Sequence, residues 1–161
     1  MIFVTIGTQE PFDRLIKAMD EIAESFPEVE IIAQIAKSNY HPSNIKTLDF
    51  MTPIEFNEHF SKAKLIVSHA GMGTIISALQ QEKPIVVIPR LTKFKEHRNE
   101  HQLATAKKFD ELNYIHVAYD ITELKKIVLS TYYHNLKPLY KLGPYAADSL
   151  ISSIGTYITS L

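Results

Sequence analysis

A short glycine-containing turn between an apolar strand and a helix is the feature that most restricts the fold of this chain. Residues 64–67 read Lys-Leu-Ile-Val, residues 68–74 read Ser-His-Ala-Gly-Met-Gly-Thr, and residues 75–81 continue with the spacing of a helix. Backbone amides at such a turn point away from the sheet, and the positive end of the helix dipole lies behind them. We therefore expect an anion site here, the alternative being that the glycines only make a tight turn.

Strands and helices alternate along the chain. Apolar segments typical of buried parallel strands are followed by segments whose apolar side chains recur at helical spacing. Expected strands cover residues 2–6, 29–36, 45–50, 64–67, 83–89 and 114–117, and expected helices cover residues 12–26, 52–63, 75–81, 98–109, 120–132 and 146–160. This order predicts an α/β fold that is Rossmann-like, with a mostly parallel sheet and helices on both faces.

A second polar cluster follows the expected strand at residues 83–89. Residues 90–102 carry Lys, Glu, His, Arg, Asn and Gln side chains in close succession. Because loops after consecutive parallel strands lie at one edge of the sheet, this cluster and the glycine turn should face the same cleft. So many donors at the end of a strand favour a contact with a ligand or partner, the alternative being a solvated loop.

Composition and charge restrict the class of protein. The chain has 161 residues, of which 45% are hydrophobic, and this is enough for a single domain over residues 1–161. A net charge of −1 gives no general attraction to nucleic acid, and the lack of cysteine excludes disulfides and thiolate metal sites. No apolar run approaches the roughly 20 residues that span a bilayer, and the first residues do not read as a signal peptide. We therefore expect a cytoplasmic protein.

Two familiar nucleotide-binding motifs are missing from the sequence. The Gly-x-Gly-x-x-Gly fingerprint should follow the first strand, but only Gly7 occurs there, and no Gly-x-x-x-x-Gly-Lys-Ser/Thr loop is present. Readings as an NAD-dependent enzyme or a P-loop protein are therefore disfavoured.

Four segments in a fixed order resemble a known family. They are VTIGT at residues 4–8, SHAGMGT at residues 68–74, KP at residues 83–84 and EHRNEHQL at residues 96–103. Together they resemble the C-terminal, donor-binding domain of family 28 glycosyltransferases. They also resemble the free-standing PssE-like or Alg13-like subunits of bacterial exopolysaccharide or capsule synthesis.

The resemblance implies one half of a GT-B enzyme. Such a subunit holds a UDP-sugar and works with a membrane-associated partner of the Alg14 or PssD type, which brings a lipid-linked saccharide acceptor. The implied reaction is an inverting transfer of a hexose, a hexuronate or an N-acetylhexosamine. The resemblance implies no cofactor and no protein-bound metal, and it implies a location at the inner face of the plasma membrane, reached through the partner.

The resemblance also assigns the parts of the donor to segments of this sequence. The family's diphosphate-binding turn corresponds to Ala70, Gly71, Met72, Gly73 and Thr74. The family's polar pair, which approaches the donor sugar, maps onto His101 and Gln102, and the neighbouring donors of the same cluster are His97, Arg98 and Asn99. The strand end whose backbone meets the nucleobase maps onto Phe50 and Met51, and the first loop offers Gly7 and Thr8 to the same cleft.

One position departs from the family pattern. Many relatives carry a glutamate in the helix after the glycines, where it holds the ribose hydroxyls, and this chain has Ser77. A serine cannot make the same charged bidentate contact. Either ribose is held more weakly, or Gln80 or Glu100 substitutes.

The sequence does not identify a catalytic base. His69, beside the turn, either stabilises the departing diphosphate or holds the turn, and Glu10 either acts in the first loop or caps the first helix. We expect the base on the partner, so that this chain alone has little activity. Two other functions stay open: a non-catalytic nucleotide-sugar-binding activator of a transferase, and a UDP-sugar epimerase-like or phosphosugar enzyme acting without a partner, although the length of the chain argues against the second.

The expected last helix carries an apolar face. The face comprises Ala147, Leu150, Ile151, Ile154, Tyr157, Ile158 and Leu161. Such a face more often packs into the core of its own domain, and this is the first expectation. The second is that it docks a partner, since half of an enzyme must expose a contact surface.

Overall fold

The fold is built around one parallel sheet. The computed structural model describes residues 1–8, 10–134 and 137–160. Its strands are β1 (Ile2–Thr5), β2 (Ile31–Gln34), β3 (Lys46–Leu48), β4 (Leu65–His69), β5 (Ile85–Ile88) and β6 (His116–Val117). They form a six-stranded sheet in the order β3-β2-β1-β4-β5-β6, and every neighbouring pair is parallel. The Rossmann-like fold expected from the sequence is confirmed.

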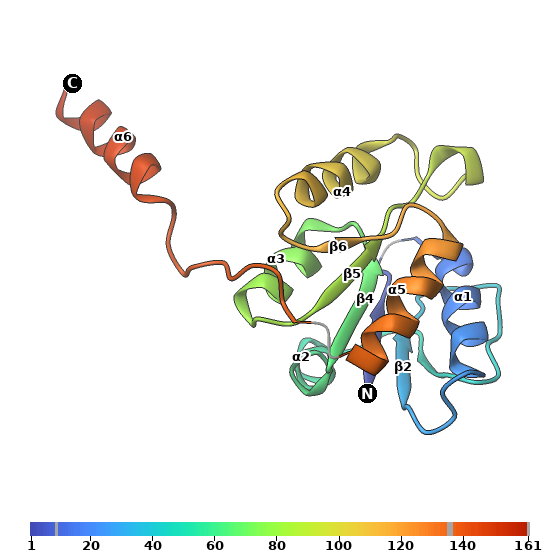
Figure 1. Cartoon of the computed structure of the whole chain (residues 1–161). Coiled ribbons are helices and arrows are strands. Elements are labelled where there is room, and N and C mark those ends of the chain that lie inside the picture. The colour runs from blue at the N-terminus through green and yellow to red at the C-terminus, as the bar shows by residue number, and fades with distance from the viewer. Residues whose placement is uncertain (9, 135–136, 161) are drawn as a thin grey trace.

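Helices cover both faces of this sheet (Figure 1). One core cluster contains side chains of α1 (Asp13–Ala23) and α5 (Ile121–His134), and a second contains side chains of α2 (Pro53–Lys62), α3 (Met72–Gln80) and α4 (His101–Glu111). Strand β1 supplies both clusters, because Ile2 and Val4 belong to the first and Phe3 to the second. Alternate residues of a strand point to opposite faces, so a continuous apolar run suits a sheet that is covered on both sides.

The start of α2 shows how local sequence fixes a boundary. The side chain of Thr52 accepts from the Glu55 amide at 3.3 Å, and the Glu55 carboxylate accepts from the Thr52 amide at 2.8 Å. Together with Pro53 in the first turn, this capping box ends the preceding loop and starts the helix, as the sequence predicts.

Far from the loops after β1, β4 and β5, a buried carboxylate organises the connection between β2 and β3. Asp20 on α1 is only 4% exposed, and its oxygens accept from the amides of Ser43 at 3.0 Å and Asn44 at 2.7 Å and from the Tyr40 hydroxyl at 2.7 Å. Burial raises the pKa of Asp20, but these hydrogen bonds outweigh it and hold the pKa below its ordinary value. The acid therefore stays ionised and fastens the loop to α1.

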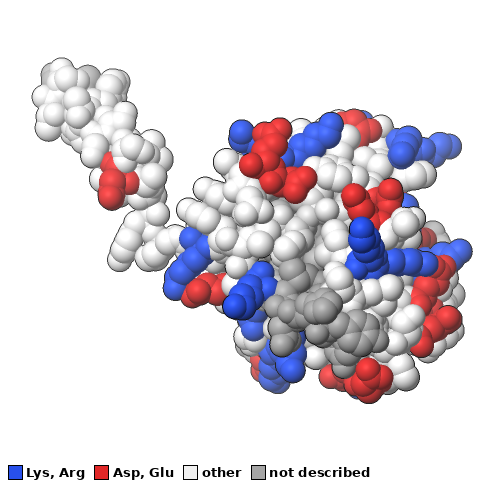
Figure 2. All heavy atoms as spheres, viewed as in Figure 1, with Lys and Arg blue, Asp and Glu red and all other residues white. Residues whose placement is uncertain are grey.

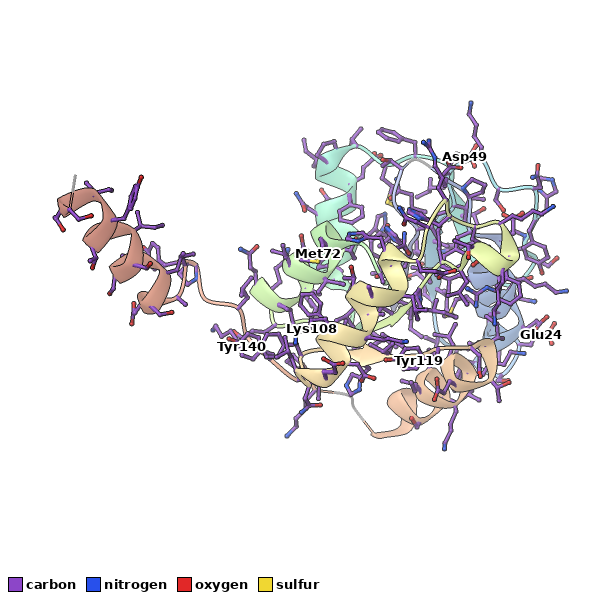
Figure 3. All side chains as sticks on the ribbon, turned by 90° about the horizontal axis from the view of Figure 1, so that it is seen from above. Glu24, Asp49, Met72, Lys108, Tyr119 and Tyr140 are labelled. Atoms are coloured by element: carbon purple, nitrogen blue, oxygen red, sulfur yellow. The ribbon has the colours of Figure 1, made fainter. Side chains whose placement is uncertain are left out.

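The last helix stands apart from the body of the molecule (Figure 1). The segment before it is fixed, since the Tyr140 ring stacks on Tyr114 with centroids 3.7 Å apart and the Leu142 amide donates to the Leu79 carbonyl at 3.1 Å. Figure 3 shows Tyr140 where the chain leaves the body. Beyond it, α6 (Asp148–Thr159) has no buried residue.

The expectation that the apolar face of this helix packs into the core is therefore wrong. Five of its side chains are at least half exposed: Leu150, Ile151, Ile154, Tyr157 and Ile158. The periodicity correctly predicted the helix, but it carries no information on what covers the face. Leu161, placed on the same face by the sequence, lies outside the described residues. Within the described part of the chain, no helix has the length and apolar character needed to cross a bilayer.

Candidate functional site

A cleft lies where the chain changes direction across the sheet. Strand β1 neighbours both β2 and β4, so the loops after β1 and β4 leave toward opposite sides and open a space between them. This cavity has a volume of about 330 Å³. Its lining comes from the first loop, the glycine turn and the segment after β5: Ile6, Gly7, Thr8, Glu10, His69, Gly71, Gly73, Thr74, Arg90, His97 and Gln102.

A larger hollow of about 660 Å³ adjoins this cleft on the segment after β5. Its lining residues are Glu10, Thr92, Lys95, Glu96, His97, Arg98 and Asn99. Glu10 and His97 line both cavities, so the two spaces are adjacent at these residues.

The glycine turn ends as a bare helix N-terminus. Gly71, with an extended backbone, is the N-cap of α3, and no side chain caps this helix. The first bond within the helix runs from the Ile75 amide to the Gly71 carbonyl, at 3.1 Å. The amides of Met72, Gly73 and Thr74 thus precede the first intrahelical donor, and they form the positive end of the helix beside the cleft. The helix begins three residues earlier than residue 75, expected from the sequence, because Gly71 already has N-cap geometry.

The two glycines of this turn have different roles. A Cβ on Gly71 would lie 2.3 Å from Nε2 of His69, whereas a Cβ on Gly73 would meet nothing within 4 Å. Gly7 approaches the same ring from the first loop, where its φ is +77° and a Cβ on it would lie 3.1 Å from Cε1 of His69. Gly7 and Gly71 therefore make room for the imidazole, while Gly73 leaves open space in front of the helix N-terminus.

His69 is uncharged at neutral pH. Burial, followed by the positive charge of Arg90, lowers the pKa of this imidazole to about 4, against a small opposing effect of the Thr5 backbone. A histidine with this pKa holds an accepted proton poorly at pH 7, so it suits hydrogen bonding better than base catalysis. Its packing between two glycines favours the turn-holding role.

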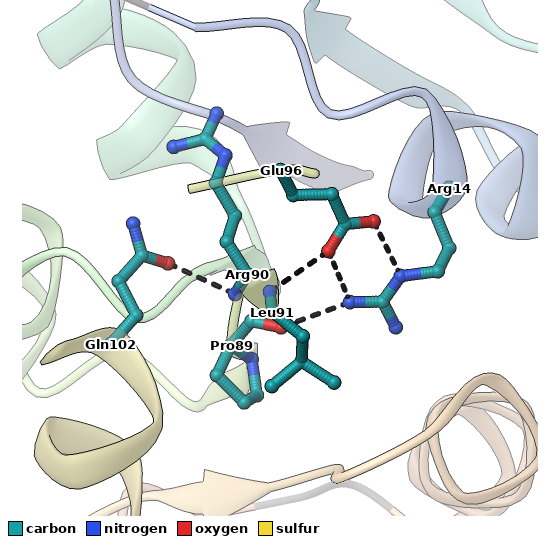
Figure 4. A network of polar contacts seen from close by, with 6 residues as sticks. All are labelled: Arg14, Pro89, Arg90, Leu91, Glu96 and Gln102. Atoms are coloured by element: carbon teal, nitrogen blue, oxygen red, sulfur yellow. Dashed lines mark hydrogen bonds and ion pairs between the residues drawn. The ribbon is translucent and has the colours of Figure 1, made fainter. Parts of the chain in front are cut away.

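Arg90 is the cleft residue that the sequence patterns did not single out. It directly follows Pro89 after β5, is 4% exposed, and lies with its guanidinium 5.0 Å from the centre of the Phe12 ring. Its backbone amide donates to Oε1 of Gln102 at 3.1 Å, which orients the Gln102 side chain in the cleft (Figure 4). The available signal was its position, since a charged residue at the carboxyl end of a buried parallel strand lies at the ligand edge of the sheet.

The segment after β5 is held by an ion pair (Figure 4). Nε of Arg14 donates to Oε1 of Glu96 at 2.7 Å, and the same guanidinium donates to the Pro89 carbonyl at 2.9 Å. The other oxygen of Glu96 accepts from the Leu91 amide at 3.0 Å. Glu96 is therefore a structural residue of the hollow, which leaves its neighbours to meet a ligand.

Several residues predicted for the site do come together. Those that line the 330 Å³ cleft are Gly7, Thr8, Glu10, His69, Gly71, Gly73, Thr74, His97 and Gln102. Arg98 and Asn99 line the adjoining hollow. Ala70 is buried behind the turn, and Met72 is 42% exposed at the start of α3 (Figure 3).

The remaining predicted residues lie outside both cavities. His101 is exposed, and its amide donates to Oδ1 of Asn99 at 3.1 Å. Phe50 is 67% exposed, whereas Met51 is buried in the core beneath α2 and α3. Ser77, one turn further along α3, lines neither cavity. Glu100 caps the short helix η1 (Thr92–Phe94) through Thr92, so it is already engaged.

Among the side chains that the structure describes, in residues 1–8, 10–130 and 137–160, no three or more His, Asp or Glu gather closely enough to hold a metal ion.

Comparisons with known proteins agree on a family. The model of the glycosyltransferase family 28 C-terminal domain matches residues 1–145. The UDP-N-acetylglucosamine transferase subunit ALG13 of Candida albicans is 37% identical over 86 residues, which cover 53% of this chain and 28% of that protein. The human subunit of the same name is 34% identical over 116 residues, covering 66% of this chain and 10% of that protein. This chain thus spans less than a third of either relative.

A solved structure supports the fold. The NMR solution structure of ALG13 superposes with a TM-score of 0.60 at 21% identity, covering 95% of this chain and 93% of that one. At this identity the superposition supports only the similarity of the folds.

Proposed function

The chain belongs to the glycosyltransferase family 28 C-terminal domain family, and from this premise we propose that it is the donor-binding subunit of a two-component, inverting GT-B glycosyltransferase. The observation that carries the proposal is the uncapped N-terminus of α3, which opens into the cleft between the loops after β1 and β4. We propose that this subunit presents a UDP-sugar to a lipid-linked acceptor in bacterial polysaccharide synthesis. The transferred group is a hexose, a hexuronate or an N-acetylhexosamine.

The two cavities suggest how a donor is placed. The diphosphate lies against the amides of Met72, Gly73 and Thr74, because an anion is stabilised there by unpaired donors and the helix dipole. The sugar extends toward Gln102 and His97, which line the cleft on the opposite side. The nucleoside then lies beyond the start of α3, on the side of Ser77.

Catalysis by this subunit consists of orienting the donor and stabilising the leaving group. The amides of the turn are fixed by the helix before the reaction starts, so they need no reorganisation as charge develops on the diphosphate. Among the described residues that line the cleft, none is a convincing base for the acceptor hydroxyl, since the depressed pKa of His69 makes it a weak base and Glu10 is exposed at the rim. The base therefore comes from the partner, and we propose that no protein-bound metal takes part.

The exposed face of α6 is the proposed docking surface for that partner. The helix carries no Lys or Arg and a single acid, Asp148, and Figure 2 shows one acidic patch on an otherwise uncharged surface. A helix that binds an anionic membrane by itself is normally rich in cations on its polar face, so a protein surface suits α6 better. Through such a partner, we propose, the subunit reaches the inner face of the plasma membrane.

Calorimetric and thermal-shift titrations of the purified chain test donor binding. UDP, UDP-glucose, UDP-galactose, UDP-glucuronate and UDP-N-acetylglucosamine are compared with NAD, all without metal. Binding of the UDP compounds but not of NAD supports the proposal, and the preferred sugar identifies the donor. Preference for NAD, or no UDP binding by the chain either alone or co-expressed with the partner, contradicts it.

Co-purification tests the docking surface separately. Ile154→Asp combined with Ile158→Asp places two charges on the apolar face of α6, whereas Ser152→Asp places one on the opposite side of the same helix. The double variant should lose the partner and keep UDP affinity, and the control should keep both. A non-catalytic activator would also bind UDP, but replacing Gln102 would then leave the turnover of the complex unchanged.

A further inference from the structure

Arg90 is held at the floor of the cleft by backbone groups rather than by acids. Its Nη2 donates to the carbonyl of Ile6 at 2.9 Å and to that of Glu10. Nε is buried and has no hydrogen-bond partner among the described residues. The guanidinium therefore joins the first loop to the end of β5 and still has donor capacity that the described contacts leave unused.

The positive charge of Arg90 is not neutralised nearby. No ion pair of Arg90 occurs in the described part of the chain, where Glu96 is already engaged by Arg14. Glu10, the other acid close enough to act on it, is exposed at the rim. Burial lowers the pKa of Arg90, yet an arginine stays protonated in proteins, so the charge persists.

The other groups around this charge add no negative compensation. His69 is neutral at pH 7, and the opposite wall of the cleft is the positive end of α3. A buried cation without a counter-ion is costly to the folded protein. An anionic ligand in the cleft would remove that cost, and the amides at the start of α3 would bind the same ligand from the other side.

We propose that Arg90 is the counter-charge for the donor diphosphate, held against the leaving group from the floor of the cleft. This inference rests on the proposed function for the identity of the anion. Arg90, which follows β5, and the start of α3, which follows β4, then contact the diphosphate from two sides. No metal ion is required to neutralise its charge.

Calorimetric titration of the full chain with inorganic pyrophosphate and with UDP tests this inference. Arg90→Met removes the charge and should lower the affinity for both ligands by at least about 30-fold. Arg90→Lys keeps the charge but not the bridge to the two carbonyls, and it should stay within about fivefold of the native chain. Lys125→Met is the matched control, since it removes an exposed cation on α5, outside both cavities, and should leave both affinities unchanged. Thermal unfolding without ligand shows that each variant is folded.

The outcomes separate this inference from the function on which it rests. UDP binding that survives Arg90→Met overturns the counter-charge and leaves the donor-binding function standing. Equal losses in folded Arg90→Met and Arg90→Lys also overturn it, because they assign Arg90 to loop geometry. Pyrophosphate binding that depends on Arg90, without any UDP binding, supports the anion site and contradicts the UDP donor. Binding of neither ligand by the native chain, either alone or co-expressed with the partner, overturns both.

Discussion

Asp20 and Arg90 are the two charged side chains that the described part of the chain buries, each only 4% exposed, and their surroundings differ. Asp20 accepts hydrogen bonds from two backbone amides and one tyrosine hydroxyl, so its charge is stabilised within the protein. Arg90 donates to two backbone carbonyls, and among the described residues its Nε has no hydrogen-bond partner and its guanidinium forms no ion pair. The charge of Asp20 is therefore stabilised without a ligand, whereas the charge of Arg90 lacks a counter-ion.

This difference separates residues that serve the fold from residues that serve binding. A buried charge whose hydrogen bonds are all supplied by its own chain contributes to stability, so its removal lowers the free energy of unfolding. A buried charge that lacks a counter-ion beside a cavity is better explained by what enters that cavity. Variants at the two places should therefore change different measurements.

The largest effect on UDP affinity is expected from a substitution that introduces an acidic side chain into the cleft. Gly73→Asp places a carboxylate in open space at the second residue of α3, where it favours the helix dipole and meets no atom within 4 Å. It should repel the diphosphate and weaken UDP binding by about 4 kcal/mol, or roughly 1,000-fold.

The melting temperature of this variant should stay the same or rise. Calorimetry and thermal unfolding measure the two quantities on one sample. Unchanged UDP affinity in Gly73→Asp would contradict the proposed position of the diphosphate at the start of α3.

The reverse pattern is expected at Asp20. Asp20→Asn keeps the shape but removes the charged acceptor of Ser43, Asn44 and Tyr40, and it should lower the free energy of unfolding by about 3 kcal/mol. UDP affinity should not change, because neither Asp20 nor these three partners line the cleft or the adjoining hollow. Urea unfolding measures the effect.

Asp110→Asn is its control. Asp110 also accepts from a tyrosine hydroxyl, that of Tyr119 at 2.7 Å, but it is exposed, so its loss should be within about 0.5 kcal/mol. Equal losses at Asp20 and Asp110 would show that burial does not strengthen this network.

The two regions should also respond to pH in different windows. The pKa of His69 is about 4 in the folded chain and ordinary in the unfolded one, so between about pH 6.5 and pH 4 the unfolded state binds the extra proton. Stability should fall across that window by about 2 kcal/mol, allowing for the part of the ring that meets solvent. Asp20, whose folded pKa is depressed, loses its contribution only below about pH 4, as it is protonated.

Urea unfolding at pH 7, 5.5 and 4 measures the first effect. His69→Gln should flatten the slope between pH 6.5 and pH 4, and what remains belongs to other histidines such as His116, whose pKa is lowered by burial. An unchanged slope in the variant would mean that His69 is protonated as easily when folded as when unfolded.

The smallest effect separates the two glycines of the turn. Gly71→Ala puts a methyl group 2.3 Å from Nε2 of His69 and must turn the ring away, which should cost about 1.5 kcal/mol of stability. Gly73→Ala meets no atom and should be neutral or slightly stabilising, since alanine favours a helix. Thermal unfolding of the pair gives the answer, and a larger loss at Gly73 would contradict the assigned roles.

Local signals in the sequence predicted most of the fold. The strands, the capping box at Thr52 and the last helix follow from apolar periodicity and end signals that each span a few residues. The position of the last helix was predicted and its packing was not, because a pattern shows that a face is apolar but not what covers it.

The sequence predicted the glycine turn and the loops that share its cleft, because each motif is contiguous and loops after parallel strands meet at one edge of the sheet. The turn at Ala70 to Thr74 could be read as an anion site because strand, glycines and helix are contiguous. The placement of Arg90 could not be predicted, since it depends on the carbonyls of Ile6 and Glu10, some eighty positions earlier in the chain. The different duties of Gly71 and Gly73 depend on the placement of one imidazole, which no spacing encodes.

The position of β1 has a consequence for synthesis on the ribosome. This strand is made first, but it lies between β2 and β4 and pairs with both of them. The second edge of β1 can pair only after residues 65–69 have left the exit tunnel. Until then the nascent chain exposes an apolar strand that is buried in the finished fold. Parallel pairing across such separations is slow to form. During translation, therefore, Ile2–Thr5 is an apolar strand edge that can pair wrongly or aggregate before β4 is available.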